Sequence, residues 1–344
     1  MKKNETIGKI GEIDTITRML NYMDRYPNQY NKPFGADAEI LELSKGIVLA
    51  LTIDTLGKED FVAGFDSYNA GWHVVNANFS DLAAVGAQPA GILISLVVPR
   101  DFPADNIVKI SQGANDAVRE FGAYIMGGDL NYGAELQLTG CAFGLVEQGG
   151  AITRIGVKPG DYVYMTGHVG GFNGAAICTI KNLDFSPFRG IRIRARVEAG
   201  KLIKKYASAC TDTSDGVLSA INNLMMVNKV GFCLEDRPEI YLPQALQLCQ
   251  KLRYPSELLL VGEAGEYELL FTVSEEKRRQ LLDACFSQGI VLTYLGRATD
   301  SSICTLIKNN NDYILDPKYF KRLYQESASP EEYLEKLLTF GFRV

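Results

Sequence analysis

The sequence predicts a mixed α/β protein of two domains, and three observations lead to this prediction. Its 344 residues are enough for about two domains of ordinary size. Short apolar segments typical of strands alternate with segments whose apolar residues recur at helical spacing, as in α/β or α+β proteins. A glycine-rich stretch at 146–161, VEQGGAITRIGVKPGD, interrupts the alternation and ends in a turn signature. We therefore expect one domain at 1–150 and a second at 151–344.

Strands are predicted where short apolar segments are bounded by Gly, Pro, Asp or Ser and are rich in β-branched or aromatic residues. The segments are IVLALTI (47–53), ILISLVV (92–98), LQLTGCAFGLV (136–146), YVYMT (162–166) and YELLFTV (267–273). In addition, NNND at 309–312 predicts the tip of a hairpin.

Helices are predicted between these strands. Residues 107–121 carry apolar side chains at helical spacing, and Gly122 then ends the pattern. Residues 69–86 and 215–228 also look helical, with Asp212 or Thr213 as a possible N-cap of the second. The C-terminal segment EEYLEKLLTFGFRV predicts an amphipathic helix.

Composition excludes several classes of function. A net charge of −6 and a pI near 5.2 argue against nucleic-acid binding. The longest apolar run, AGILISLVV, is far shorter than a membrane span of about 20 residues. Seven scattered cysteines without a C-x-x-C pair predict reduced thiols in a cytoplasmic protein. With only His73 and His168 in the chain, a histidine-based triad or metal site has few possible members.

Six aspartates lie at predicted strand ends and loops or inside an apolar helix. Taken singly, most could cap a turn or a helix, but a charge such as Asp81 amid an apolar helix must find a partner or a cation. Together they suit Mg²⁺, which prefers oxygen ligands and would let an acidic protein bind a polyphosphate. The six are Asp37 in FGADAEIL, Asp54 in TIDT, Asp81 in NFSDLAAVGA, Asp129 in MGGDL, and Asp212 and Asp215 in CTDTSDGVL.

A second possible phosphate-binding element is the glycine-rich TGHVGGFNGA at 166–175. Glycines allow the backbone to approach a phosphate, and a helix N-terminus offers unpaired N–H groups. The segment matches neither the P-loop nor the G-x-G-x-x-G pattern. A tight turn from strand to helix explains it equally well.

Several of these segments, in order, resemble the thiamine-monophosphate kinase family, in the superfamily of aminoimidazole-ribonucleotide synthetase. The resemblance implies a PurM-like fold and a homodimer whose N-terminal sheets pair into a β-barrel. It also implies ATP, several Mg²⁺ ions and a small-molecule phosphate acceptor, whose ionised oxygen needs no general base. The matching stretches are IGKIGEIDTITRML, GADAEIL, TIDTL, NANFSDLAAVGAQPA, MGGDL, TRIGVKPGDYVYMTG, DTSDGV, YELLFTV and LGRATD.

The resemblance also implies a role for each matching residue. Asp54, Asp212 and Arg154 would be catalytic. Nucleotide contacts would come from Gly128, Asp129, Arg154 and Ser214. The implied metal ligands are Asp37, Thr52, Asp54, Asp81, Asp129, Asp212 and Asp215.

The chain departs from the family where the acceptor would bind. Phe61 stands at the position of the family's substrate-binding histidine. The family pattern G-G-E-D-Y-E-L is replaced by GEAGEYELL, so either Glu263 or Glu266 could be the substrate-binding acid. Near the C-terminus Pro317 occupies the place of a family aromatic, which Tyr319 or Phe320 could replace. The pattern also lacks the first acid before Asp37 and the hydroxyl at Ile53.

Three functions follow from this pattern. One is a thiamine-monophosphate kinase with a rebuilt acceptor pocket. Another is an ATP-dependent enzyme of the same superfamily that acts on a different small phosphate, carboxylate or amide. The third is an ATP-binding protein without catalysis, against which the retention of all six aspartates argues.

Overall fold

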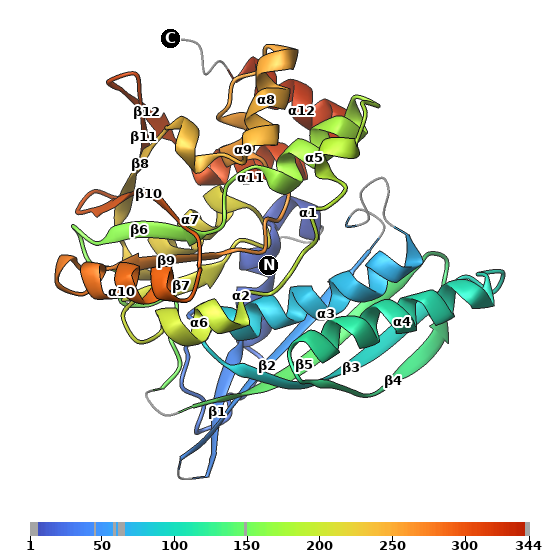
Figure 1. Ribbon diagram of the computed structural model, residues 1–344. Helices are drawn as coiled ribbons and strands as arrows, with labels where there is room; N and C mark the ends of the chain where they lie inside the picture. The colour runs from blue at the N-terminus through green and yellow to red at the C-terminus, as the bar shows by residue number, and fades with distance from the viewer. Residues whose placement is uncertain (1–5, 45, 58–59, 61–65, 148–149, 341–344) are drawn as a thin grey trace.

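The computed structural model describes residues 6–44, 46–57, 60, 66–147 and 150–340, arranged around two β-sheets (Figure 1). Helices α1 (Ile7–Ile10) and α2 (Glu12–Leu20) precede the first sheet. The chain is of the mixed α/β class that the sequence predicts. No helix within the described ranges has both the length and the apolar character needed to cross a membrane.

The first sheet has the strand order β1-β2-β5-β3-β4, and only β3 and β4 pair in parallel. Helices α3 (Ser67–Ala84) and α4 (Ala104–Glu120) cover one face of this sheet, as Figure 1 shows. Its strands are β1 (Glu39–Ser44), β2 (Ile47–Leu56), β3 (Gln88–Val98), β4 (Tyr124–Tyr132) and β5 (Gln137–Val146).

The second sheet has the order β12-β11-β8-β10-β6-β9-β7, antiparallel except between β8 and β11. Its strands are β6 (Tyr162–Thr166), β7 (Ala209–Asp212), β8 (Gly231–Glu235), β9 (Leu269–Val273), β10 (Leu292–Thr299), β11 (Cys304–Lys308) and β12 (Asn311–Leu315).

Helices lie around the second sheet, and a group of them gathers at the top of Figure 1. This group consists of α5 (Gly171–Ile180), α8 (Pro243–Leu252), α9 (Leu258–Val261), α11 (Pro317–Gln325) and α12 (Pro330–Thr339). The others are α6 (Val197–Ile203), α7 (Val217–Asn228) and α10 (Glu275–Ser287).

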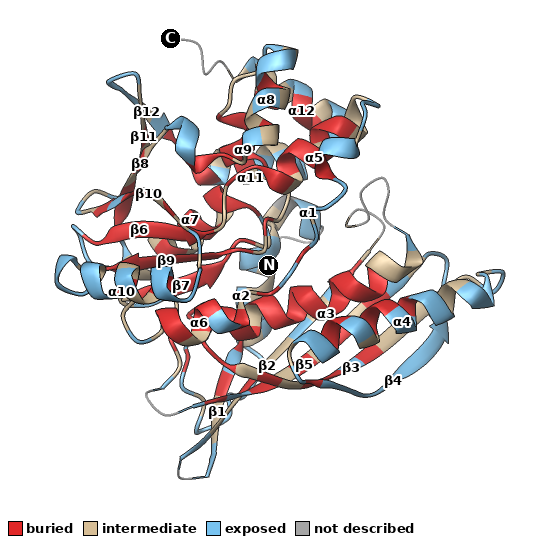
Figure 2. Ribbon diagram, viewed as in Figure 1, coloured by how far each residue is buried: buried red, intermediate tan, exposed pale blue. Residues whose placement is uncertain are grey.

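Helix α3 joins the two sheets. It contacts β2 and β5 of the first sheet, β7 and β9 of the second, and helices α4 and α6. Most of its residues are therefore buried (Figure 2). Two glycines bring α3 and α4 close together, because a Cβ atom at Gly71 would lie 1.8 Å from the carbonyl oxygen of Ile110 and one at Gly113 would lie 1.9 Å from that of Tyr68.

The predicted strands and helices are confirmed, most of them with shifted ends. Residues 341–344 of the predicted C-terminal helix lie outside the described residues. The strand expected at 267–273 begins at Leu269, and the hairpin tip lies between β11 and β12. Two local expectations are wrong. The N-cap of α7 is Gly216, with a φ of 84°, because the hydroxyl of Thr213 instead pairs with the backbone of Glu268. Asp129 lies inside strand β4, whereas the sequence places it at a strand end or in a loop. The domain boundary near residue 150 stays a prediction.

Candidate functional site

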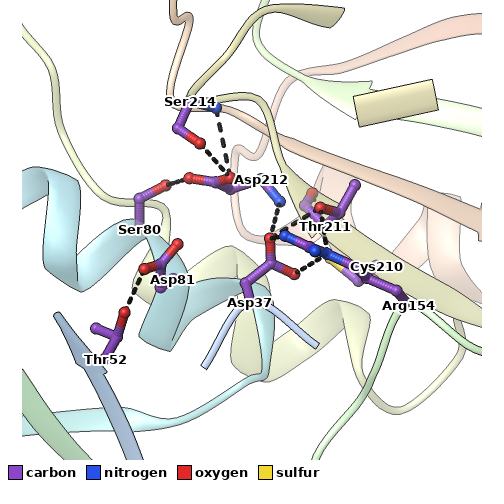
Figure 3. Close-up of polar contacts among 9 residues, drawn as sticks. All are labelled: Asp37, Thr52, Ser80, Asp81, Arg154, Cys210, Thr211, Asp212 and Ser214. Atoms are coloured by element: carbon purple, nitrogen blue, oxygen red, sulfur yellow. Dashed lines mark hydrogen bonds and ion pairs between the residues drawn. The ribbon is translucent and has the colours of Figure 1, made fainter. Parts of the chain in front are cut away.

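Three of the six aspartates meet between the two sheets. Asp37 precedes β1, Asp81 lies in α3, and Asp212 ends β7. One carboxylate oxygen of each lies within 4.8 Å of the corresponding oxygens of the other two (Figure 3). We call Asp37, Asp81 and Asp212 the aspartate cluster.

Neighbouring side chains orient each carboxylate of the cluster (Figure 3). The Asp37 carboxylate accepts hydrogen bonds from Arg154 Nη2 at 2.7 Å and from the Thr211 hydroxyl at 2.8 Å. The hydroxyl of Thr52 donates to Asp81.

Asp212 accepts hydrogen bonds from the hydroxyls of Ser80 at 2.7 Å and Ser214 at 2.9 Å. Ser80 and Asp81 are neighbours on α3, so one helix both supplies a carboxylate and orients another.

Burial and mutual repulsion raise the pKa values of two carboxylates of the cluster, Asp81 and Asp212. Burial raises the pKa of Asp81 well above its ordinary value, and the charges of Asp54 and Asp212 raise it further. Burial, followed by the charge of Asp37, raises the pKa of Asp212 to about 7. A cation between these carboxylates would remove the repulsion that favours their protonated forms.

Asp54 lies beside the cluster, on β2. Burial is the main cause that raises its pKa, a hydrogen bond with Asp81 lowers it, and the charge of Asp215 raises it. Its backbone N–H donates to the side chain of Asn78 on α3. Thr52, two residues earlier on the strand, contacts Asp81, so these two side chains share the sheet face under α3.

The remaining predicted metal and nucleotide residues lie outside the aspartate cluster. Gly128 and Asp129 are exposed in the edge strand β4. The backbone of Gly128 passes so close to β3 that a Cβ atom would lie 1.9 Å from the carbonyl oxygen of Ile94. Asp215 is exposed and forms an ion pair with Lys321 of α11 at 2.8 Å.

A cavity of about 440 Å³ begins next to the cluster and extends among the helices of the second half of the chain. Ser214 and Asp215 line it near the cluster, and apolar residues of α5, α9 and α12 form much of its wall. It is large enough for a small organic molecule.

The cavity distinguishes the two acids that the sequence leaves open. Glu263 lines it and forms an ion pair with Lys321 at 3.3 Å. Glu266 is buried elsewhere and accepts hydrogen bonds from the backbone N–H groups of Gly170 and Phe172, where α5 begins.

The aromatic residues near the C-terminus are divided between the cavity and the packed interior of the helices. Tyr319 packs against Phe320 and Phe340, with ring centroids 5.6 and 5.1 Å away, and does not line the cavity. Tyr324 and Tyr333 line it instead. Phe61 lies outside the described residues.

Comparison with known proteins places the chain in a family. The family described as AIR synthase related protein, N-terminal domain, matches residues 35–146. Thiamine-monophosphate kinase of Escherichia coli K12 is 28% identical over 319 residues, covering 90% of this chain and 97% of the relative. That of Halobacterium salinarum is 32% identical over 230 residues, covering 66% of this chain and 77% of the relative. The chain belongs to the thiamine-monophosphate kinase family.

A solved structure confirms the fold of the family. The structure of AaThiL complexed with AMPPCP and TMP superposes with a TM-score of 0.76 at 21% identity, and the match covers 92% of this chain and all of that one. The resemblance of the sequence to thiamine-monophosphate kinases and the predicted PurM-like fold are therefore confirmed.

Several residues of the site could not be found from residue types alone. Ser80, which orients Asp212, precedes Asp81 in NFSDLAAVGA, and the adjacent buried acid is the feature that could have drawn attention to it. Thr211 and Lys321 contact the acids only through the tertiary fold. His73 is buried in α3 and lies 3.0 Å from the Tyr267 hydroxyl at the cavity wall.

Proposed function

We propose that this member of the thiamine-monophosphate kinase family transfers the γ-phosphoryl group of ATP to the phosphate of thiamine monophosphate, giving thiamine diphosphate and ADP. Family membership over most of the chain supports this activity. The observation that carries it is the aspartate cluster, which joins both halves of the chain next to a cavity of suitable size.

The cluster fits magnesium. Its ligand atoms are all carboxylate oxygens, which Mg²⁺ prefers, and its raised pKa values indicate a place where a cation would be favourable. We propose that Asp37, Asp81 and Asp212, with Thr52 and Asp54 beside them, hold Mg²⁺. When bound, Mg²⁺ would bring phosphate groups together and offset their charge.

The remaining assigned roles are proposals of the same kind. Asp129 and Asp215 would join the metal ligands once nucleotide is present. Gly128, Arg154 and Ser214 would contact the nucleotide. Arg154 would also fix the orientation of the Asp37 carboxylate, to which it donates two hydrogen bonds.

No general base is required in this proposal. The attacking oxygen belongs to a phosphate, which is ionised at neutral pH, so the chain must position it and offset its charge. His73 suits no proton transfer at neutral pH, because burial lowers its pKa to about 3 and keeps it neutral.

The cavity is the proposed acceptor site. It adjoins the aspartate cluster through Ser214 and Asp215, and Glu263 is its buried acid. Tyr324 and Tyr333 would pack against the organic part of the acceptor, in place of Tyr319.

We also propose a homodimer formed by the open face of the first sheet. Ile53, Cys141 and Leu93 lie in one row across β2, β5 and β3, on the face opposite α3. Ile53 and Leu93 are 65% and 46% exposed, respectively, and a second copy would cover them. The described cysteines are all free thiols, which supports a cytoplasmic location.

The activity can be tested by measuring ADP release from ATP in the presence of Mg²⁺ and one acceptor at a time. Thiamine monophosphate should support ADP release, and EDTA should abolish it. The altered acceptor positions favour one alternative, namely another small phosphate, carboxylate or amide as acceptor. ADP release with such a compound and none with thiamine monophosphate would establish that alternative.

A further inference from the structure

The cavity is lined by several acids but by one basic side chain. Among the described residues around it, Lys321 is the single lysine or arginine, whereas the acids are Asp60, Asp215, Glu263 and Glu331. A phosphate group that entered this cavity would be repelled by the carboxylates unless a cation lay beside it. Lys321 is the cation that the chain itself supplies.

Two carboxylates hold the ammonium group of Lys321 in a fixed place. Its Nζ atom lies 2.8 Å from Asp215 Oδ2 and 3.3 Å from Glu263 Oε2. Glu263 is itself fixed by the hydroxyl of Ser219, at 3.2 Å from both of its oxygens. A lysine ammonium has three N–H donors, so one remains for a ligand after these two contacts.

The position of Lys321 connects the cavity with the aspartate cluster. Its partner Asp215 follows Ser214, whose hydroxyl donates to Asp212 of the cluster at 2.9 Å. The polar end of the cavity therefore lies beside the proposed metal site. Apolar residues such as Phe172, Ile177 and Leu334 line other parts of its wall. A ligand with an apolar body and one anionic end would place that end near Lys321.

We propose that Lys321 binds the phosphate of the acceptor and makes the site select a phosphomonoester over the corresponding free alcohol. This assignment rests on the proposed function, since it places the acceptor in the cavity. It adds a residue that determines specificity, on helix α11.

The test compares binding of thiamine monophosphate and thiamine by calorimetry, with Mg²⁺ and without ATP. The wild-type protein should bind thiamine monophosphate more tightly than thiamine. Lys321→Ala and Lys321→Met should weaken binding of thiamine monophosphate about 10- to 100-fold, the effect of one lost hydrogen bond between charged groups. Binding of thiamine should change little, which also shows that the variants are folded. Lys318→Ala, at an exposed position of the same helix, is the matched control and should bind both compounds normally.

Two results would overturn the role of Lys321. One is that the Lys321 variants lose affinity equally for thiamine monophosphate and thiamine, or lose affinity for neither compound. The other is a wild-type protein that does not prefer thiamine monophosphate to thiamine. If the proposed function is wrong, the result is different: the protein binds thiamine monophosphate in preference to thiamine but forms no thiamine diphosphate when ATP is added.

Discussion

The guanidinium of Arg154 donates two hydrogen bonds to the carboxylate of Asp37, from Nη2 at 2.7 Å and from Nε at 3.2 Å. The side chain of Asp37 is 1% exposed and that of Arg154 is 17% exposed. The pair thus joins the segment before β1 to the segment that leads into the second sheet. It also offsets the charge of one member of the aspartate cluster.

Removing Arg154 should destabilise the protein strongly. Arg154→Ala leaves Asp37 as a buried carboxylate without its cation, so we expect the free energy of unfolding in urea to fall by about 3–5 kcal/mol. Arg154→Lys should recover only part of this loss, because lysine restores the positive charge but lacks the planar fork that matches a carboxylate. Arg279→Ala is the control, because it removes an exposed ion pair, and it should change the free energy of unfolding by less than about 1 kcal/mol. A similarly small effect of Arg154→Ala would contradict this account of the pair.

Ser80 should control metal affinity without being a metal ligand. Ser80→Ala removes the hydrogen bond that orients the carboxylate of Asp212, and losses of such supporting contacts typically weaken metal binding about 10- to 100-fold. Titration with Mn²⁺, followed by electron paramagnetic resonance, measures this affinity. Ser111→Ala, on an exposed part of α4, is the control. Equal affinities of the two variants would show that Ser80 does not position Asp212 for metal.

Stability of the metal-free protein should fall as the pH rises from about 4 to about 7. Burial raises the pKa of Asp212 to about 7, and burial likewise raises that of Glu266 to about 7. The folded protein therefore holds protons that the unfolded chain releases at lower pH, so folding is favoured below the unfolded pKa and loses this advantage towards pH 7.

Magnesium provides the control for this pH dependence. Because Mg²⁺ competes with protons for the same carboxylates, it should raise the thermal midpoint more at about pH 8 than at about pH 5. Scanning fluorimetry with EDTA or with millimolar Mg²⁺ measures both midpoints. A larger magnesium effect at the lower pH would contradict the assignment of the aspartate cluster as the metal site.

The two glutamates near residue 265 should behave differently when substituted. Glu263→Gln removes one of the two carboxylates that hold the ammonium group of Lys321, so it should raise the KM for the acceptor. Glu266→Gln weakens the contacts at the start of α5 and should lower the free energy of unfolding by about 1 kcal/mol. Steady-state kinetics and urea unfolding of both variants separate the two roles. An acceptor KM altered only in the Glu266 variant would reverse this assignment.

The sequence is sufficient to predict the elements that have a strong local pattern. Strand β6 matches its predicted ends, because the buried run YVYMT is bounded by a turn and a glycine. Strand β4 does not follow such a pattern, since its two glycines resemble a loop. It forms all the same, as an edge strand that pairs with β3 around a bulge between Ile92 and Leu93.

The residues of the site also differ in whether the local sequence pattern predicts them. Asp81 can be predicted because a charge inside an apolar helix needs a partner. The contact between Arg154 and Asp37 joins residues 117 positions apart, and no local pattern indicates it. Lys321 lies in an ordinary amphipathic segment, so only the packing of α11 decides that it faces the cavity. Long-range contacts of this kind are fixed by the tertiary fold.

The most direct test of the account is phosphorus NMR of the purified protein with ATP, Mg²⁺ and thiamine monophosphate, beside an Asp81→Asn variant. Asparagine keeps the size of the side chain but removes its negative charge from the aspartate cluster. We expect the wild-type protein to produce the resonances of thiamine diphosphate and ADP, and the variant to leave both substrates intact. Equal product formation by the two proteins, or intact ATP and thiamine monophosphate with the wild type, would contradict the proposed activity of this site.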